Sequence, residues 1–500
     1  MRCPQRIGGL VMQKARNKAG DYRDNEGRPR RVSGTPASGL WWLAAFSFIV
    51  FTMGGGSRSD ITSLILLRPI TFLFLIIAIW QSDKFTFRRA GLPLWIAVSI
   101  AAITALQLIP LPPSFWQSLP GREIEKAVLE AAGMANSWQP ITMSPSRTLN
   151  AFFSSAVPIT ALLLCFGKAK IAKHHLVWIL FACGIATAIL SLLQIIGSSS
   201  SPLYLYRITN SGVAVGLFSN RNHNAIFLAS LIPLLAWLGF GQRSRSRENH
   251  NRPTRVVLTL GSILFVVAMI LVTGSRNGAG LAILLVIATS LLLWFAQSLD
   301  PLVQSKAQPL WKRFLPILLP AMVVMMAGIT YFASRSLVID RIQGGGADAG
   351  LRGEVLPYLI DLVGEYFPFG SGFGSFYLVF QTIEPASMLK PEYLNHAHND
   401  ILQLLIEAGL AGAFLIAITF YWFIWTGWKG FVDFSKCIKS GAAMPPAVFA
   451  WCGLGAVLAG SIFDYPLRTP SLMLSVAIMA VIASSSIGLR NQPGGAKIAE

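Results

Sequence analysis

The chain has 500 residues, of which 53% are hydrophobic and 13% are charged, and its formal net charge is +19. Soluble domains carry about 25% charged residues, so this composition excludes an ordinary soluble protein and predicts a polytopic membrane protein. In a soluble chain such a positive charge would point to nucleic acid. We expect no nucleic-acid partner here, because the basic residues follow a membrane topology.

The chain opens with a polar, basic segment, residues 1–39, ahead of the first apolar run. A signal peptide has its apolar core much nearer the start, so we interpret this segment as a disordered cytoplasmic tail. A solvated charge run without a partner is favoured over a nucleic-acid-binding arm. Residues 488–500 form a second, shorter cytoplasmic tail.

Between the tails, apolar runs recur that are each long enough to cross the hydrocarbon core of a bilayer. They occupy residues 40–56, 61–80, 91–110, 149–167, 175–197, 223–240, 256–273, 278–296, 315–333, 401–428, 447–464 and 470–487. The sequence therefore predicts an all-α fold, with about 12 transmembrane helices in a domain that covers residues 40–487.

The distribution of Lys and Arg predicts the orientation of these spans. Basic residues cluster between alternate runs, in the segments 81–89, 168–173, 241–255, 297–314 and 429–446, and in both tails. With twelve spans and both termini inside, all of these segments fall on one side, which the positive-inside rule identifies as the cytoplasm. The two longest loops, 111–148 and 334–400, then lie in the periplasm.

Both periplasmic loops contain predicted helices. Residues 121–132 form a charged helical stretch, and residues 351–367 have apolar side chains on one helical face, which we expect to lie along the membrane surface. Residues 367–376 then form a glycine-rich turn with aromatic side chains. The spacing of its glycines resembles a phosphate-binding loop, but no strand precedes it, so we predict no nucleotide site.

A polar, titratable group stands at the start of the apolar run 401–428. It consists of His396, His398, Asn399 and Asp400. Imidazole suits proton transfer near neutral pH, and such a group at a membrane boundary predicts a functional site. The alternative is a simple helix cap by Asn399 or Asp400 with solvated histidines. At positions i and i+2, the two imidazoles would face different ways in a helix.

Three arginines fall on the predicted outer side, where basic residues are otherwise sparse: Arg221, Arg276 and Arg352. An arginine at the membrane boundary needs a partner, because an unpaired buried charge costs several kcal/mol. The partner could be a lipid phosphate or a carboxylate such as Asp464 or Glu354. A planar guanidinium also grips phosphate oxygens with two hydrogen bonds, so three arginines beside the histidines favour a bound lipid diphosphate.

The five cysteines point neither to disulfides nor to a metal site. They lie in the N-terminal tail, in apolar runs and in a basic loop, without metal-ligand spacing: Cys3, Cys165, Cys183, Cys437 and Cys452. We predict no disulfide, no bound metal and no cofactor.

Several motifs together resemble the O-antigen ligase and polymerase superfamily. His398-Asn399 is followed by nine residues and then by Gly409-Leu-Ala-Gly412, as in the His-Asn/Ser/Gln, nine-residue gap, Gly-x-x-Gly signature of that family. The segments SNRNHNA (219–225), TGSRNG (273–278), YFPFGSGFGSF (366–376) and FDYPLRTP (463–470) are similar to its other recurrent segments. Ala413-Phe414 replace the Thr-Gly that often follows in ligases, which favours a polymerase or a protein-glycosylating relative over a lipid A–core ligase.

The resemblance implies an inner-membrane glycosyltransferase with its active face in the periplasm. Such an enzyme needs no metal and moves a glycan from a polyprenyl diphosphate donor to a hydroxyl of a glycan, lipid or protein acceptor. Carried over to this chain, His398 would be the catalytic base or the group that orients the acceptor, and Arg276 and Arg352 would hold the diphosphate, with Arg221 as a weaker candidate. His396 and Asn399 would help to bind or orient substrate. Without a nucleophilic side chain in this set, we expect a single displacement with inversion.

A transporter or a flippase for lipid-linked glycans is the alternative function, since twelve spans are also common among carriers. Helices broken near the middle of the membrane would favour that alternative. The unusual polar residues lie at one face instead, which favours surface chemistry.

Overall fold

The computed structural model describes residues 37–168, 171–241, 252–301, 320–321, 328, 347–389 and 393–484. In these ranges the fold is helical, apart from a small sheet in which β1 (Pro110–Leu111) pairs antiparallel with β2 (Gln139–Pro140). The predicted all-α class is therefore confirmed. Residues 1–36 of the first tail and the whole of the second tail lie outside the described residues.

Eleven of the twelve predicted apolar runs correspond to helices within the described ranges. These are α2 (Ala37–Met53), α3 (Leu64–Trp80), α4 (Thr86–Leu106), α7 (Pro145–Phe166), α8 (Lys173–Ile196), α9 (Arg221–Ala236), α10 (Arg252–Val272), α11 (Arg276–Leu299), α17 (Asp400–Lys439), α18 (Ala447–Phe463) and α19 (Pro470–Ser484). Among the described residues, seven helices are long and apolar enough to cross a membrane, and four further apolar helices are shorter. The run 315–333 falls almost wholly outside the described residues, so the count of twelve stays a prediction.

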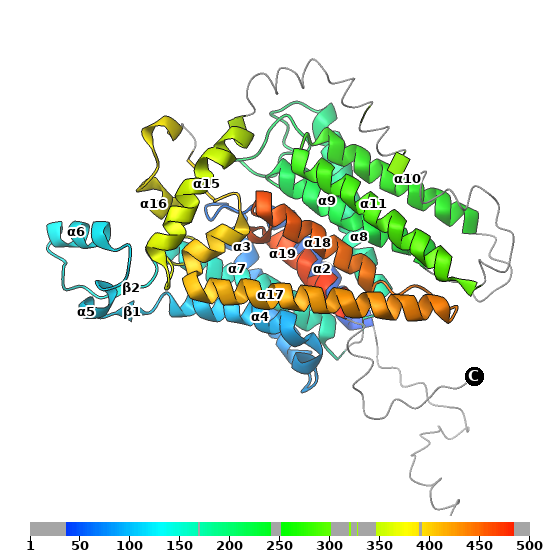
Figure 1. The fold of residues 1–500 in the computed structure, drawn as a ribbon, viewed down its shortest axis with the longest axis horizontal. Helices are drawn as coiled ribbons and strands as arrows, with labels where there is room; N and C mark the ends of the chain where they lie inside the picture. The colour runs from blue at the N-terminus through cyan, green and yellow to red at the C-terminus, as the bar shows by residue number, and fades with distance from the viewer. Residues whose placement is uncertain are drawn as a thin grey trace, which may run out of the picture.

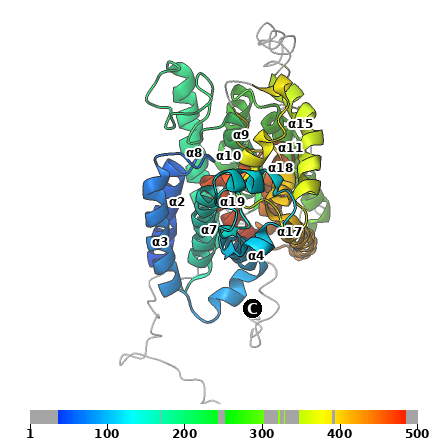
Figure 2. The same ribbon diagram turned by 90° about the vertical axis from the view of Figure 1, so that its left-hand side faces the viewer.

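The long helices lie side by side along the longest axis of the molecule (Figure 1). Seen from one end, α7 and α19 lie in the middle of the bundle, with α2 and α3 on one side and α11 and α17 on the other (Figure 2). Helix α9 is the most enclosed element, since every residue from His223 to Ala236 is buried. Along these residues the helix has no solvent-exposed polar face, which is typical of a helix in the centre of a membrane bundle.

Short helices and the 20-residue helix α15 gather at one end of the bundle, at the left of Figure 1. They are α5 (Pro113–Trp116), α6 (Glu123–Ala131), α15 (Ala347–Tyr366) and α16 (Phe376–Gln381), followed by the 3-10 turn η2 (Ala386–Met388). The predicted helices at 121–132 and 351–367 are therefore present as α6 and α15. The apolar face of α15 differs from the expectation: Val355, Leu359 and Leu362 pack into a core cluster with Phe376 and Ile406 instead of lying on the membrane.

Helix α17 is interrupted near its start. Gly409 has φ 51° and ψ −128°, a backbone conformation that only glycine adopts without strain. A Cβ at this position would lie 2.1 Å from the carbonyl oxygen of Pro368, so the glycine is needed for space as well. The first glycine of the family signature thus marks a helix break against the glycine-rich turn.

Candidate functional site

Three histidines surround the ring of Tyr465, and we call these four residues the histidine cluster. The ring centroids of His223, His396 and His398 lie 5.0, 4.4 and 4.9 Å from that of Tyr465. The histidines come from the start of α9 and from the loop before α17, and Tyr465 follows α18. The fold therefore joins segments that are more than 170 residues apart in sequence, from His223 to His396.

The carboxylate of Asp464 lies behind two of these imidazoles and is completely buried. Its Oδ1 atom is 3.5 Å from Nδ1 of His398 and 3.7 Å from Nε2 of His223. The side-chain amide of Asn222 donates to Oδ2 at 2.7 Å, and the backbone N–H of Tyr465 donates to Oδ1 at 2.9 Å. Burial alone would raise the pKa of Asp464, but its hydrogen bonds and charge interactions with His223 and His398 hold that pKa well below its ordinary value.

His398 has a strained backbone. Its φ is 50°, and it is the one non-glycine residue with positive φ among the described residues. Such a conformation costs about 1–3 kcal/mol and tends to occur at functional sites. Asn399 follows directly, and its Oδ1 atom accepts the backbone N–H groups of Ile401 and Leu402 at 3.0 Å each. Because Asn399 caps α17, the imidazole of His398 is held at the N-terminus of this helix.

His396 is held by the first turns of α17. Its Nδ1 atom is 3.2 Å from the side-chain amide nitrogen of Gln403, which also donates to Glu407 at 2.9 Å. Burial, together with the positive charge of Arg468, holds the pKa of His396 well below its ordinary value. The segment that carries both histidines is not helical, so His396 and His398 can contact the same ring, contrary to the prediction that they face different ways.

Arg468 links the turn after α18 to the start of α17. It lies in the 3-10 turn η3 (Pro466–Arg468), with Nε 3.3 Å from Asp400 and one terminal nitrogen 2.8 Å from Glu407. Both carboxylates are buried, and they raise the pKa of Arg468 against the opposing effect of burial. This ion-pair network fixes the histidine loop relative to the helix bundle.

The glycine-rich turn fits against the break in α17. The backbone N–H groups of Ser371 and Gly372 donate to the carbonyls of Ile406 and Glu407, at 2.9 Å each, and Leu410 donates to Pro368 at 2.8 Å. The backbone groups that the break frees are thus satisfied by the turn. This packing explains its glycines without a bound phosphate.

Arg221 and Arg276 occupy equivalent places on two packed helices. Each is the first residue of its helix, α9 or α11, and the first turns touch, since a Cβ on Gly278 would lie 2.3 Å from that of Ala225. Arg276 is exposed and has no hydrogen bond or ion pair within the described part of the chain. Asp464, the alternative partner considered for an arginine, lies against His398 and His223. Arg352 belongs to α15, but its side chain lies outside the described residues.

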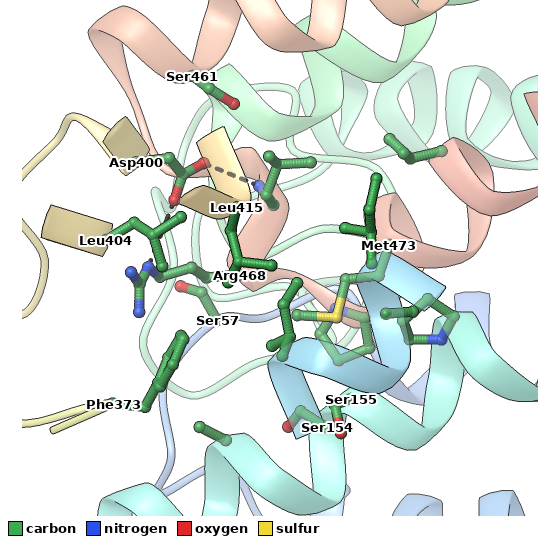
Figure 3. Close-up of a pocket in the computed structure, with 18 of the residues that line it drawn as sticks. Ser57, Ser154, Ser155, Phe373, Asp400, Leu404, Leu415, Ser461, Arg468 and Met473 are labelled. Atoms are coloured by element: carbon green, nitrogen blue, oxygen red, sulfur yellow. Dashed lines mark hydrogen bonds and ion pairs between the residues drawn. The ribbon is translucent and has the colours of Figure 1, made fainter. Parts of the chain in front are cut away.

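A cavity of about 370 Å³ opens beside the histidine cluster. Its polar end is lined by His396, Asp400, Arg468 and Arg147, and Asp400 and Arg468 are joined by dashed lines at that end in Figure 3. Away from this end the lining becomes apolar, with residues such as Met473 and Leu415. We call this cavity the apolar slot. Volumes of about 300–1,000 Å³ are typical of ligand sites.

The described residues contain no group of three or more His, Cys, Asp or Glu side chains arranged to hold a metal ion. The four cysteines in the described ranges, Cys165, Cys183, Cys437 and Cys452, are free.

Residues 260–417 match the O-antigen ligase family. The resemblance inferred from the motifs is thereby confirmed at the level of the O-antigen ligase superfamily. The O-antigen ligase region contains Arg276, Arg352, both loop histidines and the Gly409 break, whereas Asp464 follows it in the chain. No curated protein matches this chain in sequence.

Sequence reasoning missed several members of the site. His223, Tyr465 and Arg468 stand in the sequence only within family-like segments. Asp464 is predicted only as a possible partner for arginine, and no pattern singles out Arg147. Each lies more than 60 residues from His398 in the chain. A buried carboxylate just after an apolar run was the available signal for Asp464, since such a charge needs a partner.

Proposed function

We propose that this protein is an inner-membrane glycosyltransferase of the O-antigen ligase type. It moves a glycan from a polyprenyl diphosphate carrier to an acceptor hydroxyl on the periplasmic face, during assembly of a cell-surface polysaccharide. The observation that carries the proposal is the pairing of His398 with the fully buried Asp464 at the end of the bundle, between arginine-bearing helix starts and an apolar slot.

The contact with Asp464 gives His398 a defined chemical role. A proton on Nδ1 faces the carboxylate, and this leaves the lone pair on Nε2 available to accept a proton. The acceptor hydroxyl gives its proton to Nε2 while its oxygen forms a bond to the anomeric carbon of the donor. The bond between that carbon and the diphosphate oxygen breaks, and the electron pair leaves with the diphosphate. General-base catalysis of this kind contributes about 10²–10⁴-fold.

The leaving diphosphate needs positive charge nearby. Arg276 is exposed and has no partner in the described part of the chain, and Arg221 begins the neighbouring helix. Preorganised cations stabilise charge as it develops in a transition state. We propose that these arginines, together with Arg352, hold the diphosphate and that the reaction requires no metal ion.

The surrounding carboxylates favour a single displacement with inversion. Asp464 is buried with both oxygens engaged, and Arg468 pairs with Asp400 and Glu407. None of these carboxylates is free to attack the anomeric carbon and form a glycosyl intermediate.

We propose, in addition, that both termini are cytoplasmic.

The test is a transfer assay with purified protein in liposomes. A labelled glycan on polyprenyl diphosphate is offered with candidate glycan, lipid or protein acceptors, in the presence of a chelator. We expect a glycosylated acceptor whose new linkage has the opposite anomeric configuration to the donor. Transport of labelled lipid across the bilayer without any new glycosidic bond would support the flippase alternative instead.

A further inference from the structure

The apolar slot runs from the histidine cluster into the helix bundle. Along α7 its lining extends from Arg147 to Leu162. These residues are 15 positions apart in a continuous helix, which corresponds to about 22 Å at 1.5 Å per residue. The slot therefore reaches through a large part of a hydrocarbon core about 30 Å thick.

The two ends of the slot differ in chemistry. Its polar end has a guanidinium, an amide and serine hydroxyls from Arg147, Asn395, Ser57 and Ser59. Its other end is lined by aliphatic and aromatic side chains from five helices, among them Ile96, Leu162, Trp422, Leu454 and Ala480. A ligand that fits both ends has an anionic or polar head and a long hydrocarbon chain.

Arg147 is held in place while its charge remains available. Its guanidinium lies 4.1 Å from the centre of the Tyr377 ring, and one nitrogen is 3.5 Å from Oδ1 of Asn395. Within the described residues it has no carboxylate at ion-pair distance. The nearby Asp60 already binds Arg58 through both oxygens, at 2.9 and 2.8 Å. An arginine stacked in this way is preorganised to grip a phosphate with two hydrogen bonds.

A seam between α4 and α17 connects the slot to the outside of the bundle. A second hollow lies on the outer side of this seam, lined from α4 by Ser99 and Ile103 and from α17 by residues that include Phe414 and Leu415. Leu415 lines both the slot and this hollow. The side chain of Phe414 is 68% exposed, as expected for a residue that faces lipid. The slot and the second hollow therefore adjoin at Leu415.

We propose that the apolar slot holds the isoprenoid chain of the donor, which enters sideways between α4 and α17, and that Arg147 binds its phosphate group. This inference rests on the proposed function. The donor is favoured over an ordinary membrane lipid because His396 and Arg468 belong to both the slot and the site, so a chain in the slot brings its head group to the histidine cluster. Arg147 is then a further substrate-binding residue, outside the matched region 260–417.

The first test fills the slot and compares two donors that carry the same glycan, one on a long polyprenyl diphosphate and one on a short prenyl diphosphate. Ala477 on α19 lines the slot and is 4% exposed, so Ala477→Trp obstructs it. We expect kcat/KM for the long-chain donor to fall at least tenfold and that for the short-chain donor to stay within threefold. Ala182→Trp, at an exposed position on α8, should leave both donors unaffected.

Two results would overturn the inference: unchanged transfer from the long-chain donor, or equal loss with both donors, which would mean that the slot supports the fold or the acceptor. A photoreactive long-chain prenyl diphosphate gives a second measurement that needs no activity. It should label α4, α17 or α19 in the native protein and lose that labelling in Ala477→Trp. If the wild-type protein transfers from neither donor, the proposed function fails, whatever the slot variants do.

The second test concerns the head group. Arg147→Gln should raise KM for both donors about 10- to 100-fold while kcat changes less than threefold, because both donors share the diphosphate. Arg207→Gln, which removes an exposed arginine from another loop, provides the charge-matched control and should behave as wild type. A loss in kcat alone, or equal losses in both variants, would rule out phosphate binding by Arg147.

Discussion

At the scale of single residues, Asp464 determines what the histidine cluster can do. A carboxylate without water around it is stable as an anion only when charges or donors face it. Here an amide, a backbone N–H and two imidazoles do so. On the proposed chemistry, Asp464 orients the imidazole of His398 and stabilises the protonated ring, much as the carboxylate does in a catalytic triad.

The two loop histidines should differ in their importance for transfer. We expect His398→Ala to reduce transfer by about 10²–10⁴-fold, because the general base is lost. His396→Ala should reduce it only partly, since His396 is bound to Gln403 and orients the loop. Initial rates of glycan transfer, compared at equal amounts of membrane-inserted protein, check this. A greater loss in His396→Ala than in His398→Ala would assign the base to the other imidazole.

Substitution of Arg276 or Arg352 by lysine should lower the activity even though the charge is kept. Replacing Arg276 or Arg352 by Lys keeps the positive charge but loses the planar fork that binds two oxygens. A hydrogen bond to a charged group contributes about 1.5–3 kcal/mol, so kcat/KM should fall roughly 10- to 100-fold. Donor titrations check this, with Arg207→Lys as the control. Unchanged turnover in both variants would indicate that these arginines contact lipid phosphates and do not bind the donor.

The lowered pKa of His396 predicts how stability depends on pH. The unfolded chain takes up a proton on His396 below about pH 6.5, whereas the folded protein does so only at a lower pH. The unfolded state then binds more protons, so the free energy of unfolding falls as the pH falls below about 6.5. Thermal unfolding of the detergent-solubilised protein between pH 7.5 and 5 checks this. The decline should be shallower in His396→Gln, and identical slopes would contradict the prediction.

Some of these residues could be predicted from sequence and others could not. His398 and Asn399 stand next to an apolar run, so a local pattern was enough to find them. The partnership of His398 with Asp464 joins residues 66 positions apart, 398 and 464, and depends on how α17 and α18 pack. No local pattern contains that information. Arg147 could not be predicted for the same reason, because its place in the slot depends on the packing of five helices.

At the scale of elements, the break in α17 joins the site to the glycine-rich turn. The helix could be predicted from its apolar run, but its interruption could not, because Gly409 in a membrane helix usually indicates close packing. The structure shows both a positive φ and a backbone carbonyl where a side chain would be. The helix length was also underestimated, since the run 401–428 continues to Lys439.

Substitution of two glycines that have similar backbone angles can distinguish the cost of backbone strain from the cost of steric crowding. Gly91 in α4 has φ 58° and nothing within 4 Å of a Cβ, whereas Gly409 has φ 51° and the Pro368 carbonyl at 2.1 Å. Gly91→Ala should cost about 1–3 kcal/mol of strain alone. Gly409→Ala should cost more and also impair transfer, because the Gly-rich turn must move. Thermal unfolding and transfer assays on both variants check this, and equal effects would show that crowding is unimportant.

At the scale of the whole molecule, the basic segments between alternate helices predict the topology. Alkaline phosphatase fused after residue 130 or 385 should be active in a bacterial host, because these positions lie in the proposed periplasmic loops. Fusions after residue 248 or 435 should be inactive, because basic residues keep those segments in the cytoplasm. Activity measurements in whole cells check this. The reverse pattern at either pair would overturn the topology and the assignment of the active face.

The histidine cluster draws on the start of α9, the loop before α17 and the turn after α18, so it forms only when nearly the whole chain has been made. Chains are synthesised from the N-terminus, and early segments settle before late ones exist. A ribosome that stops before Asp464 leaves His398 without its carboxylate and Tyr465 absent. On the proposed chemistry, such a fragment cannot discharge the carrier lipid onto water. Interrupted synthesis would therefore yield inert protein.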